Sequence, residues 1–94
     1  MSVVWTKTSE LTLDEIVDYI RNKFGSLISD KYYFDVLQTI ENIENNPKLF
    51  PIFQDKTQTR KAIINKKTIL YYQIETGTIY FLAFYEVRNG THKL

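Results

Sequence analysis

The chain contains no cysteine. This absence excludes disulfide bonds, thiolate metal sites and cysteine nucleophiles. Small secreted domains usually depend on disulfides, so the composition favours the cytoplasm. Residues 1–7 do not join a basic segment to a long apolar one, and no apolar run approaches the roughly 20 residues of a membrane span. We therefore expect a cytoplasmic protein with neither a signal peptide nor a membrane-spanning helix.

Histidine and glycine are also scarce, with one histidine, His92, and three isolated glycines. A single histidine excludes a metal site with two histidine ligands, and isolated glycines cannot form a loop that holds nucleotide phosphates. Three acidic residues of the predicted first helix, Asp14, Glu15 and Asp18, fit a solvent-facing surface better than a metal site. We expect no metal and no cofactor, and the sequence argues against an ordinary hydrolase, kinase or dehydrogenase.

Apolar and aromatic residues are plentiful. Of the 94 residues, 44% are hydrophobic, and they include seven tyrosines and six phenylalanines. Aromatic side chains bury large areas, so a compact core is feasible. The length fits a single domain that covers residues 1–94.

Charge is unevenly distributed along the chain. Residues 1–47 carry a net charge of −4 and residues 48–94 a net charge of +5, which together give the overall +1. The basic half predicts an anionic partner. An equally good explanation is that helix surfaces are acidic and strand edges are basic.

Two helices are predicted after a short first strand at residues 3–6. The first helix runs over 12–24, where Thr12 and Glu15 form a capping box and Gly25 ends the helix. The second runs over 29–46, from Ser29 as its N-cap to the residue before Pro47. The short connection predicts an antiparallel hairpin. The apolar stripes expected to face the core are Leu13, Ile16, Val17, Ile20 and Phe24 in the first helix and Tyr33, Val36, Leu37, Ile40 and Ile43 in the second.

Strand patterns follow an apolar connector at residues 47–51. Three strands are predicted near 59–65, 68–75 and 78–87, separated by short polar turns. The last is nearly continuous in apolar residues, which predicts a central strand buried on both faces. The predicted fold class is α+β, with an N-terminal strand and a helical hairpin packed on a C-terminal antiparallel sheet.

The chemistry available for a functional site is basic and aromatic, and it lies in the second half of the chain. Guanidinium and ammonium groups can hold phosphates, and exposed tyrosines can stack on bases. For each tyrosine considered alone, packing in the core or in a cross-strand pair explains its presence better than stacking on a base does. The candidate binding residues are Arg60, Lys61, Lys66, Lys67, Tyr71, Tyr85 and Lys93, with Tyr72 and Tyr80 as further candidates for stacking.

The order of these elements resembles the RelE/ParE toxins of type II toxin–antitoxin systems. The likeness covers nearly the whole chain, and its strongest mark is an arginine just past an apolar last strand. No single motif is specific, and the ordered set carries the resemblance. The matching segments are Val3-Val4-Trp5-Thr6, Asn46-Pro47-Lys48-Leu49-Phe50-Pro51, Arg60-Lys61-Ala62-Ile63-Ile64, Thr68-Ile69-Leu70-Tyr71-Tyr72-Gln73-Ile74 and Ile79-Tyr80-Phe81-Leu82-Ala83-Phe84-Tyr85-Glu86-Val87-Arg88-Asn89.

The resemblance implies a growth inhibitor neutralised by a cognate antitoxin. RelE-type members cut messenger RNA on the ribosome, and ParE-type members poison DNA gyrase. The catalytic residues of a RelE-type cutter would be Arg88, after the last strand, and His92, near the C-terminus. Such enzymes also place an arginine in the middle strand, where this chain has Thr68 or Ile69.

The resemblance therefore favours a ParE-like gyrase poison, with a role in growth inhibition and plasmid stabilisation. A RelE-like messenger RNA endoribonuclease is the first alternative, and a protein-binding relative without toxicity is the second. The expected partners are a cognate antitoxin, in a hetero-oligomeric complex, and either DNA gyrase or the ribosome with its messenger RNA.

Overall fold

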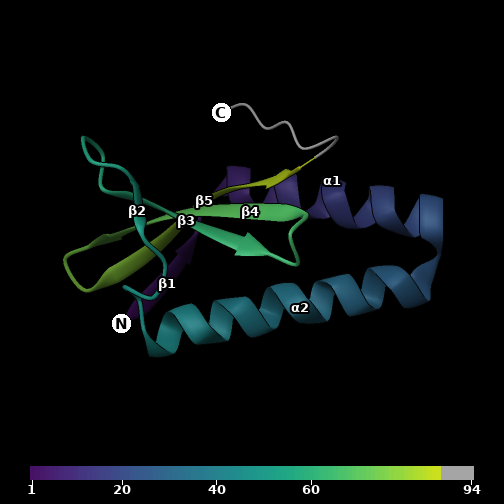
Figure 1. Cartoon of the computed structure of the whole chain (residues 1–94), viewed down its shortest axis with the longest axis horizontal. Helices are drawn as coiled ribbons and strands as arrows, with labels where there is room; N and C mark the ends of the chain where they lie inside the picture. Colours follow the sequence, from purple (N-terminus) through teal and green to yellow (C-terminus); the bar gives the residue numbers. More distant parts are fainter. Residues whose placement is uncertain (88–94) are drawn as a thin grey trace.

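The computed structural model describes residues 1–87 and has the predicted α+β architecture. A helical hairpin and a twisted sheet form two layers, with α2 along one side of the sheet and α1 behind it (Figure 1). The elements are β1 (Ser2–Trp5), α1 (Lys7–Phe24), α2 (Ser26–Asn45), β2 (Ile52–Gln54), β3 (Thr59–Ile64), β4 (Thr68–Glu75) and β5 (Thr78–Glu86). Among the described residues, no helix is long and apolar enough to cross a membrane.

The sheet has five strands in the order β1-β5-β4-β3-β2. Strands β3, β4 and β5 form the predicted antiparallel meander, whereas β1 lies parallel to β5. The edge strand β2 was missed, because it has only three residues and follows a proline. Strand β5 is an inner strand between β1 and β4, but its burial alternates along the strand, so the prediction that it is buried on both faces was wrong. Strand β4 is central and has five consecutive buried residues, Thr68–Tyr72.

Helix α1 begins one and a half turns earlier than predicted, and Thr12 is not its cap. Thr6 is the N-cap, and its hydroxyl accepts a hydrogen bond from the amide of Ser9 at 3.1 Å. The same hydroxyl donates to the carbonyl oxygen of Phe81 at 2.8 Å. Thr6 therefore caps the helix and joins its first turn to β5, a contact that local capping rules do not contain.

Thr12 has a different role, because its side chain faces the sheet from inside α1. Its hydroxyl donates to the carbonyl oxygen of Thr8 at 2.7 Å and accepts from the amide of Phe84 at 2.9 Å. The β4–β5 ladder shifts register here, so that Tyr71 pairs with Ala83 and Tyr72 with Phe81. A bulge leaves backbone groups without a hydrogen-bond partner on the neighbouring strand. The hydroxyl of Thr12 supplies such a partner to the amide of Phe84 in β5.

Gly25 alone separates the two helices. It ends α1 as predicted, but α2 begins at Ser26, and Ser29 is a buried residue within α2 whose hydroxyl donates to the carbonyl oxygen of Ser26. Gly25 has φ +92° and ψ 171°, a combination that is almost restricted to glycine. The sharp corner of the hairpin therefore depends on glycine at this position.

We expect Gly25→Ala to lower the free energy of unfolding by about 1–3 kcal/mol, the usual cost of such backbone strain. A Cβ at this position would meet no heavy atom within 4 Å, so the cost is conformational and not steric. Urea denaturation followed by circular dichroism measures it. Ser26→Ala, one residue further on, is the control. Equal stability of Gly25→Ala and wild type would contradict the strain.

The core lies between the hairpin and one face of the sheet. Tyr32, Val36 and Ile43 of α2 are buried, but Phe24, Tyr33 and Leu37, which were predicted to face the core, are exposed. Helix α2 is rotated so that Tyr32 and not Tyr33 reaches the sheet. The remaining core residues include Leu13, Ile16, Ile20, Ile40, Ala62, Ile64, Leu70, Tyr72, Ile79, Phe81 and Phe84.

Candidate functional site

The face of the sheet that the helices leave open carries a row of aromatic side chains. Tyr71 lies 5.3 Å from Phe53 and 5.7 Å from Tyr85, measured between ring centroids. The ammonium of Lys61 lies 5.0 Å from the centre of the Phe53 ring. The row thus runs from β2 through β4 to β5, with a cation at its β2 end.

Tyr71, a candidate binding residue, is only 1% accessible, which agrees with a place in the core or in a cross-strand pair and not with stacking on a base. Burial also raises the pKa of its hydroxyl above the ordinary value. Tyr85 is half-buried, so it retains some surface for a ligand. Tyr72 points to the helix side, where it is fully buried and its hydroxyl donates to the carbonyl oxygen of Pro47 at 2.8 Å. Of the candidate tyrosines, Tyr85 and Tyr80 keep an accessible surface.

Arg60 and Lys61 were predicted to bind together, but they do different things. Consecutive residues of a strand point to opposite faces, and Lys61 belongs to the open face. The Arg60 guanidinium donates to the carbonyl oxygen of Phe50 at 2.7 Å. Arg60 therefore holds the connector between α2 and β2 against the sheet, and Lys61 is the better placed of the two for a ligand.

Lys66 and Lys67 lie in the exposed turn between β3 and β4, where Asn65 and Lys66 have positive φ angles of 54° and 61°. The turn stands at the end of the sheet that faces the hairpin corner (Figure 1). The structure places these lysines away from Lys61. The predicted residues Arg88, His92 and Lys93 lie outside the described residues.

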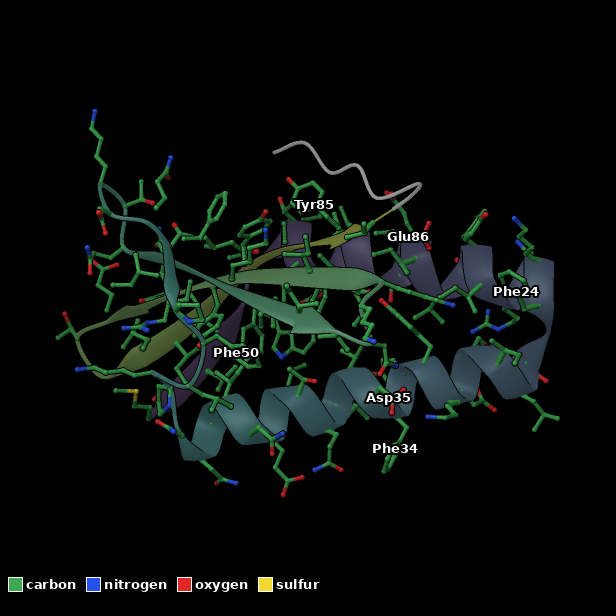
Figure 2. The ribbon with its side chains drawn as sticks, in the orientation of Figure 1. Phe24, Phe34, Asp35, Phe50, Tyr85 and Glu86 are labelled. Carbon is green, nitrogen blue, oxygen red and sulfur yellow. The ribbon has the colours of Figure 1, made fainter. Side chains whose placement is uncertain are left out.

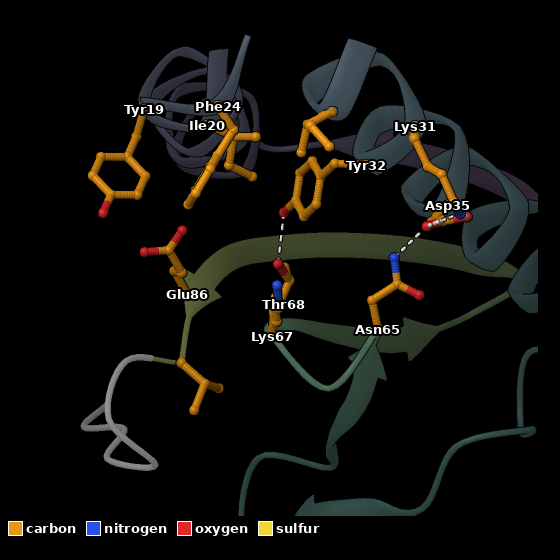
Figure 3. A pocket seen from close by; sticks show the side chains of 12 residues that line it. Tyr19, Ile20, Phe24, Lys31, Tyr32, Asp35, Asn65, Lys67, Thr68 and Glu86 are labelled. Carbon is orange, nitrogen blue, oxygen red and sulfur yellow. Dashed lines mark hydrogen bonds and ion pairs between the residues drawn. The ribbon is translucent and has the colours of Figure 1, made fainter. Parts of the chain in front are cut away.

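A groove opens between the hairpin corner and this end of the sheet. Its volume is about 490 Å³, and its walls come from α1, α2, the β3–β4 turn and the end of β5. The hydroxyl groups of Tyr32 and Thr68 share a hydrogen bond of 2.7 Å across its floor (Figure 3). Burial raises the pKa of Tyr32 to about 12. Tyr32 therefore stays neutral and keeps this bond at physiological pH.

One side of the groove is closed by a polar contact between α2 and the turn. The side-chain amide of Asn65 donates to the Asp35 carboxylate, and the Lys31 ammonium lies 3.2 Å from the same carboxylate (Figure 3). The hydrogen bond from Asn65, followed by Lys31, lowers the pKa of Asp35. This contact attaches the turn to the helix.

The contact predicts a pH dependence of stability. Because the pKa of Asp35 is lower in the folded state than its ordinary value of 3.8, the stabilisation that the carboxylate provides is complete above that value and is lost as the pH falls through the folded pKa. We expect Asp35→Asn to be less stable than wild type at pH 7 and the difference to shrink below pH 4. Urea denaturation at both pH values measures it.

The control for this prediction is Asp14→Asn, which makes the same chemical change on an exposed residue of α1. A stability difference for Asp35→Asn that stays constant from pH 7 to pH 3 would contradict the carboxylate contact.

Within residues 1–87, no three histidine, aspartate or glutamate side chains are close enough to hold a metal ion. The described part of the chain instead offers an aromatic row beside Lys61 and an apolar groove with a hydrogen-bonded floor. The groove could not be predicted from the sequence, because its walls come from four segments that are far apart in the chain. The available indication was that Thr68 lies two and four residues before Leu70 and Tyr72, so the three share one face of the strand.

Residues 3–90 match the family model described as ParE toxin of the type II toxin–antitoxin system parDE. The chain belongs to the ParE toxin family. It is thus the toxin component of a type II toxin–antitoxin system, and the ParE type is favoured over the RelE type. The partner of such a toxin is an antitoxin. The predicted resemblance is confirmed.

The fold agrees with that assignment. A solved structure titled "Chromosomal ParDE TA system from P. aeruginosa" superposes with a TM-score of 0.80 at 18% sequence identity, over 94% of this ParE-type chain and 97% of the other. At this identity the likeness shows a shared fold. A comparison with curated protein sequences gives no match.

Proposed function

We propose that this toxin inhibits growth by poisoning DNA gyrase in the cytoplasm. The observation that carries the proposal is the family match over residues 3–90. The middle strand supports it, because the positions at which RelE-type cutters place an arginine hold buried Thr68 and buried Ile69. The hydroxyl of Thr68 is already bonded to Tyr32. This part of the strand lacks a group that could stabilise the charge of a scissile phosphate.

A cognate antitoxin would neutralise the toxin by covering the open sheet face or the hairpin with an apolar segment. Phe53 and Ile63 are exposed on the sheet, and Lys61 lies beside Phe53. Acidic residues in the antitoxin segment would meet Lys61 and Arg88, and opposite charges would mainly accelerate association. The complex is therefore proposed to be hetero-oligomeric.

A nuclease of the RelE type is the second candidate. The observation in its favour is the aromatic row of Phe53, Tyr71 and Tyr85 with Lys61 at one end, since aromatic rings next to cations are typical of surfaces that bind single-stranded RNA. The burial of Tyr71 leaves less of this row accessible than the sequence predicted.

The experiment uses the full chain made by cell-free synthesis, which avoids toxicity to a host. The chain is added to gyrase with relaxed plasmid, and separately to ribosomes that translate a defined messenger RNA. We expect supercoiling to be blocked and the messenger RNA to remain intact. Cleavage with normal supercoiling would establish the nuclease. If neither reaction is affected, the protein is a relative without toxicity. Addition of the product of the neighbouring gene tests the antitoxin, and restored supercoiling is the expected result.

A further inference from the structure

The turn between β3 and β4 places a lysine at a position where the backbone favours glycine. Asn65 and Lys66 have consecutive positive φ angles of 54° and 61°. The amide of Lys67 donates to the carbonyl oxygen of Ile64 at 3.1 Å and closes the turn. Two positive φ angles are typical of a type I′ turn, in which asparagine followed by glycine is strongly preferred. Asn65 follows this preference and Lys66 departs from it.

A second turn of the same chain shows the usual choice. The turn between β4 and β5 also has two positive φ angles, 47° at Thr76 and 77° at Gly77, and glycine takes its second position. In the left-handed region a Cβ lies too close to the backbone, a cost that glycine does not have. Residues held there against this cost cluster at functional sites. Lys66 therefore indicates a use for its ammonium and not a need of the turn.

Two contacts hold the turn in place. The side-chain amide of Asn65 donates to the carboxylate of Asp35 in α2 (Figure 3). On the other side, the amide of Val87 donates to the carbonyl oxygen of Lys67 at 2.7 Å, so that the chain leaving β5 stays beside the turn. The turn is thus a fixed base for two adjacent lysine side chains.

The ammonium groups of Lys66 and Lys67 are available to a ligand. Both residues are exposed, and within residues 1–87 neither forms an ion pair. Two carboxylates, those of Asp35 and Glu86, lie at the same end of the sheet and line the groove (Figure 2). Asp35 is paired with Lys31. The turn therefore presents two positive charges that suit an anionic ligand.

We propose that Lys66 and Lys67 bind the phosphate backbone of duplex DNA. Interfaces between proteins have an apolar centre and are depleted of lysine, whereas residues 65–67 have only polar side chains. Contacts with phosphates require cations and no apolar centre, and they make up at least half of the hydrogen bonds between proteins and DNA. The choice of DNA as the source of the phosphates rests on the proposed function, because gyrase acts on duplex DNA.

The dependence of binding on salt measures the number of phosphates that the protein contacts. Each cation that binds a phosphate contributes about −0.9 to the slope of log K against log salt concentration. Removal of one lysine should therefore make the loss of affinity between about 50 mM and about 200 mM salt about 3.5-fold smaller. Removal of both should have about the square of that effect.

Lys66→Gly is the most informative variant. Glycine adopts a φ of 61° without strain, so the variant loses the charge and keeps the turn. Lys67→Ala removes the second charge, and Lys66→Arg keeps the first and should keep the slope. Lys56→Ala is the matched control, because Lys56 is exposed in the turn before β3 and thus at the other end of that strand. It should leave the slope unchanged. Circular dichroism shows that each variant is folded.

Fluorescence anisotropy of a labelled duplex of about two helical turns, titrated with the full chain made by cell-free synthesis, measures the affinity at each salt concentration. Gyrase is absent, so the result is separate from the supercoiling assay. The expected slope changes with normal supercoiling would support the phosphate site and contradict the gyrase proposal.

A duplex that stays unbound at about 50 mM salt would overturn the inference even if supercoiling is blocked. Equal slopes for wild type and the double variant Lys66→Gly, Lys67→Ala would overturn it too, as would an equal change in Lys56→Ala. Tighter binding of a single-stranded RNA of the same length would contradict the assignment to duplex DNA.

Discussion

Phe81→Ala is expected to lower the free energy of unfolding by about 3–5 kcal/mol, the usual cost of removing a buried phenylalanine ring. Phe81 is 0% exposed, and its ring makes an edge-to-face contact with Trp5 at 5.0 Å between centroids. The backbone of β5 at this residue also accepts the hydrogen bond from Thr6. The cavity would lie where β1, α1 and β5 meet. The total free energy of unfolding of a small domain is only about 5–15 kcal/mol, so Phe81→Ala would remove much of it.

Urea denaturation followed by far-ultraviolet circular dichroism measures this loss and avoids the fluorescence of Trp5, which the substitution itself perturbs. Phe24→Ala makes the same change at a site that is 57% exposed and should alter stability by no more than about 0.5 kcal/mol. If the two variants unfold at the same urea concentration, the packing described for Phe81 is wrong.

Arg88→Ala is expected to reduce both growth inhibition and the block of gyrase supercoiling by about thirtyfold or more, the effect of losing an arginine that dominates an interface. The expectation rests on the proposed function and on the resemblance, in which an arginine follows the apolar last strand. Strand β5 ends at Glu86 and is hydrogen-bonded to strands on both sides. In the sequence, Arg88 is two residues beyond the end of this strand.

His92→Ala separates the two proposed mechanisms. In a gyrase poison the histidine is dispensable, so we expect full activity. In a nuclease it would act as a general acid, and both His92→Ala and Arg88→Ala would lose cleavage of ribosome-bound messenger RNA. Full toxicity of Arg88→Ala would remove Arg88 from the site under either mechanism. A melting curve for each variant shows that it is folded.

The sheet and the hairpin were predictable because they follow from local patterns. Gly25 ends α1 at the predicted residue, and the strands β3, β4 and β5 begin and end within a residue of their predicted bounds. Apolar periodicity and turn residues act over a few positions, so the sequence expresses them directly. The starts of both helices were wrong. For α1, Thr6 and Thr12 are both acceptable caps, and the contact of Thr6 with Phe81 decides between them. Helix α2 begins at Ser26, directly after Gly25, without a side-chain cap.

The candidate site was less predictable than the fold. The sequence offered Arg60, Lys61 and Tyr71 as one group, yet the pleat of β3 places Arg60 on the helix side, whereas Lys61 and Tyr71 share the open face. Arg60 holds the connector, Tyr71 is buried between Phe53 and Tyr85, and Lys61 stays at the open face. Composition shows which functional groups the chain has. Whether a given side chain is accessible depends on which neighbouring strands and side chains pack over it.

By itself, the sequence determined the α+β class, the hairpin followed by an antiparallel meander, and the family. These depend on the order and periodicity of residues along the chain. Only the tertiary structure decided that Tyr32 and not Tyr33 faces the sheet, that Thr68 closes the floor of a groove, and that Leu27 and Phe34 remain in solvent. The physical reason is that the rotation of a helix and the pairing of strands are set by contacts between residues distant in sequence, and one residue of rotation moves a side chain by about 100° around the helix axis.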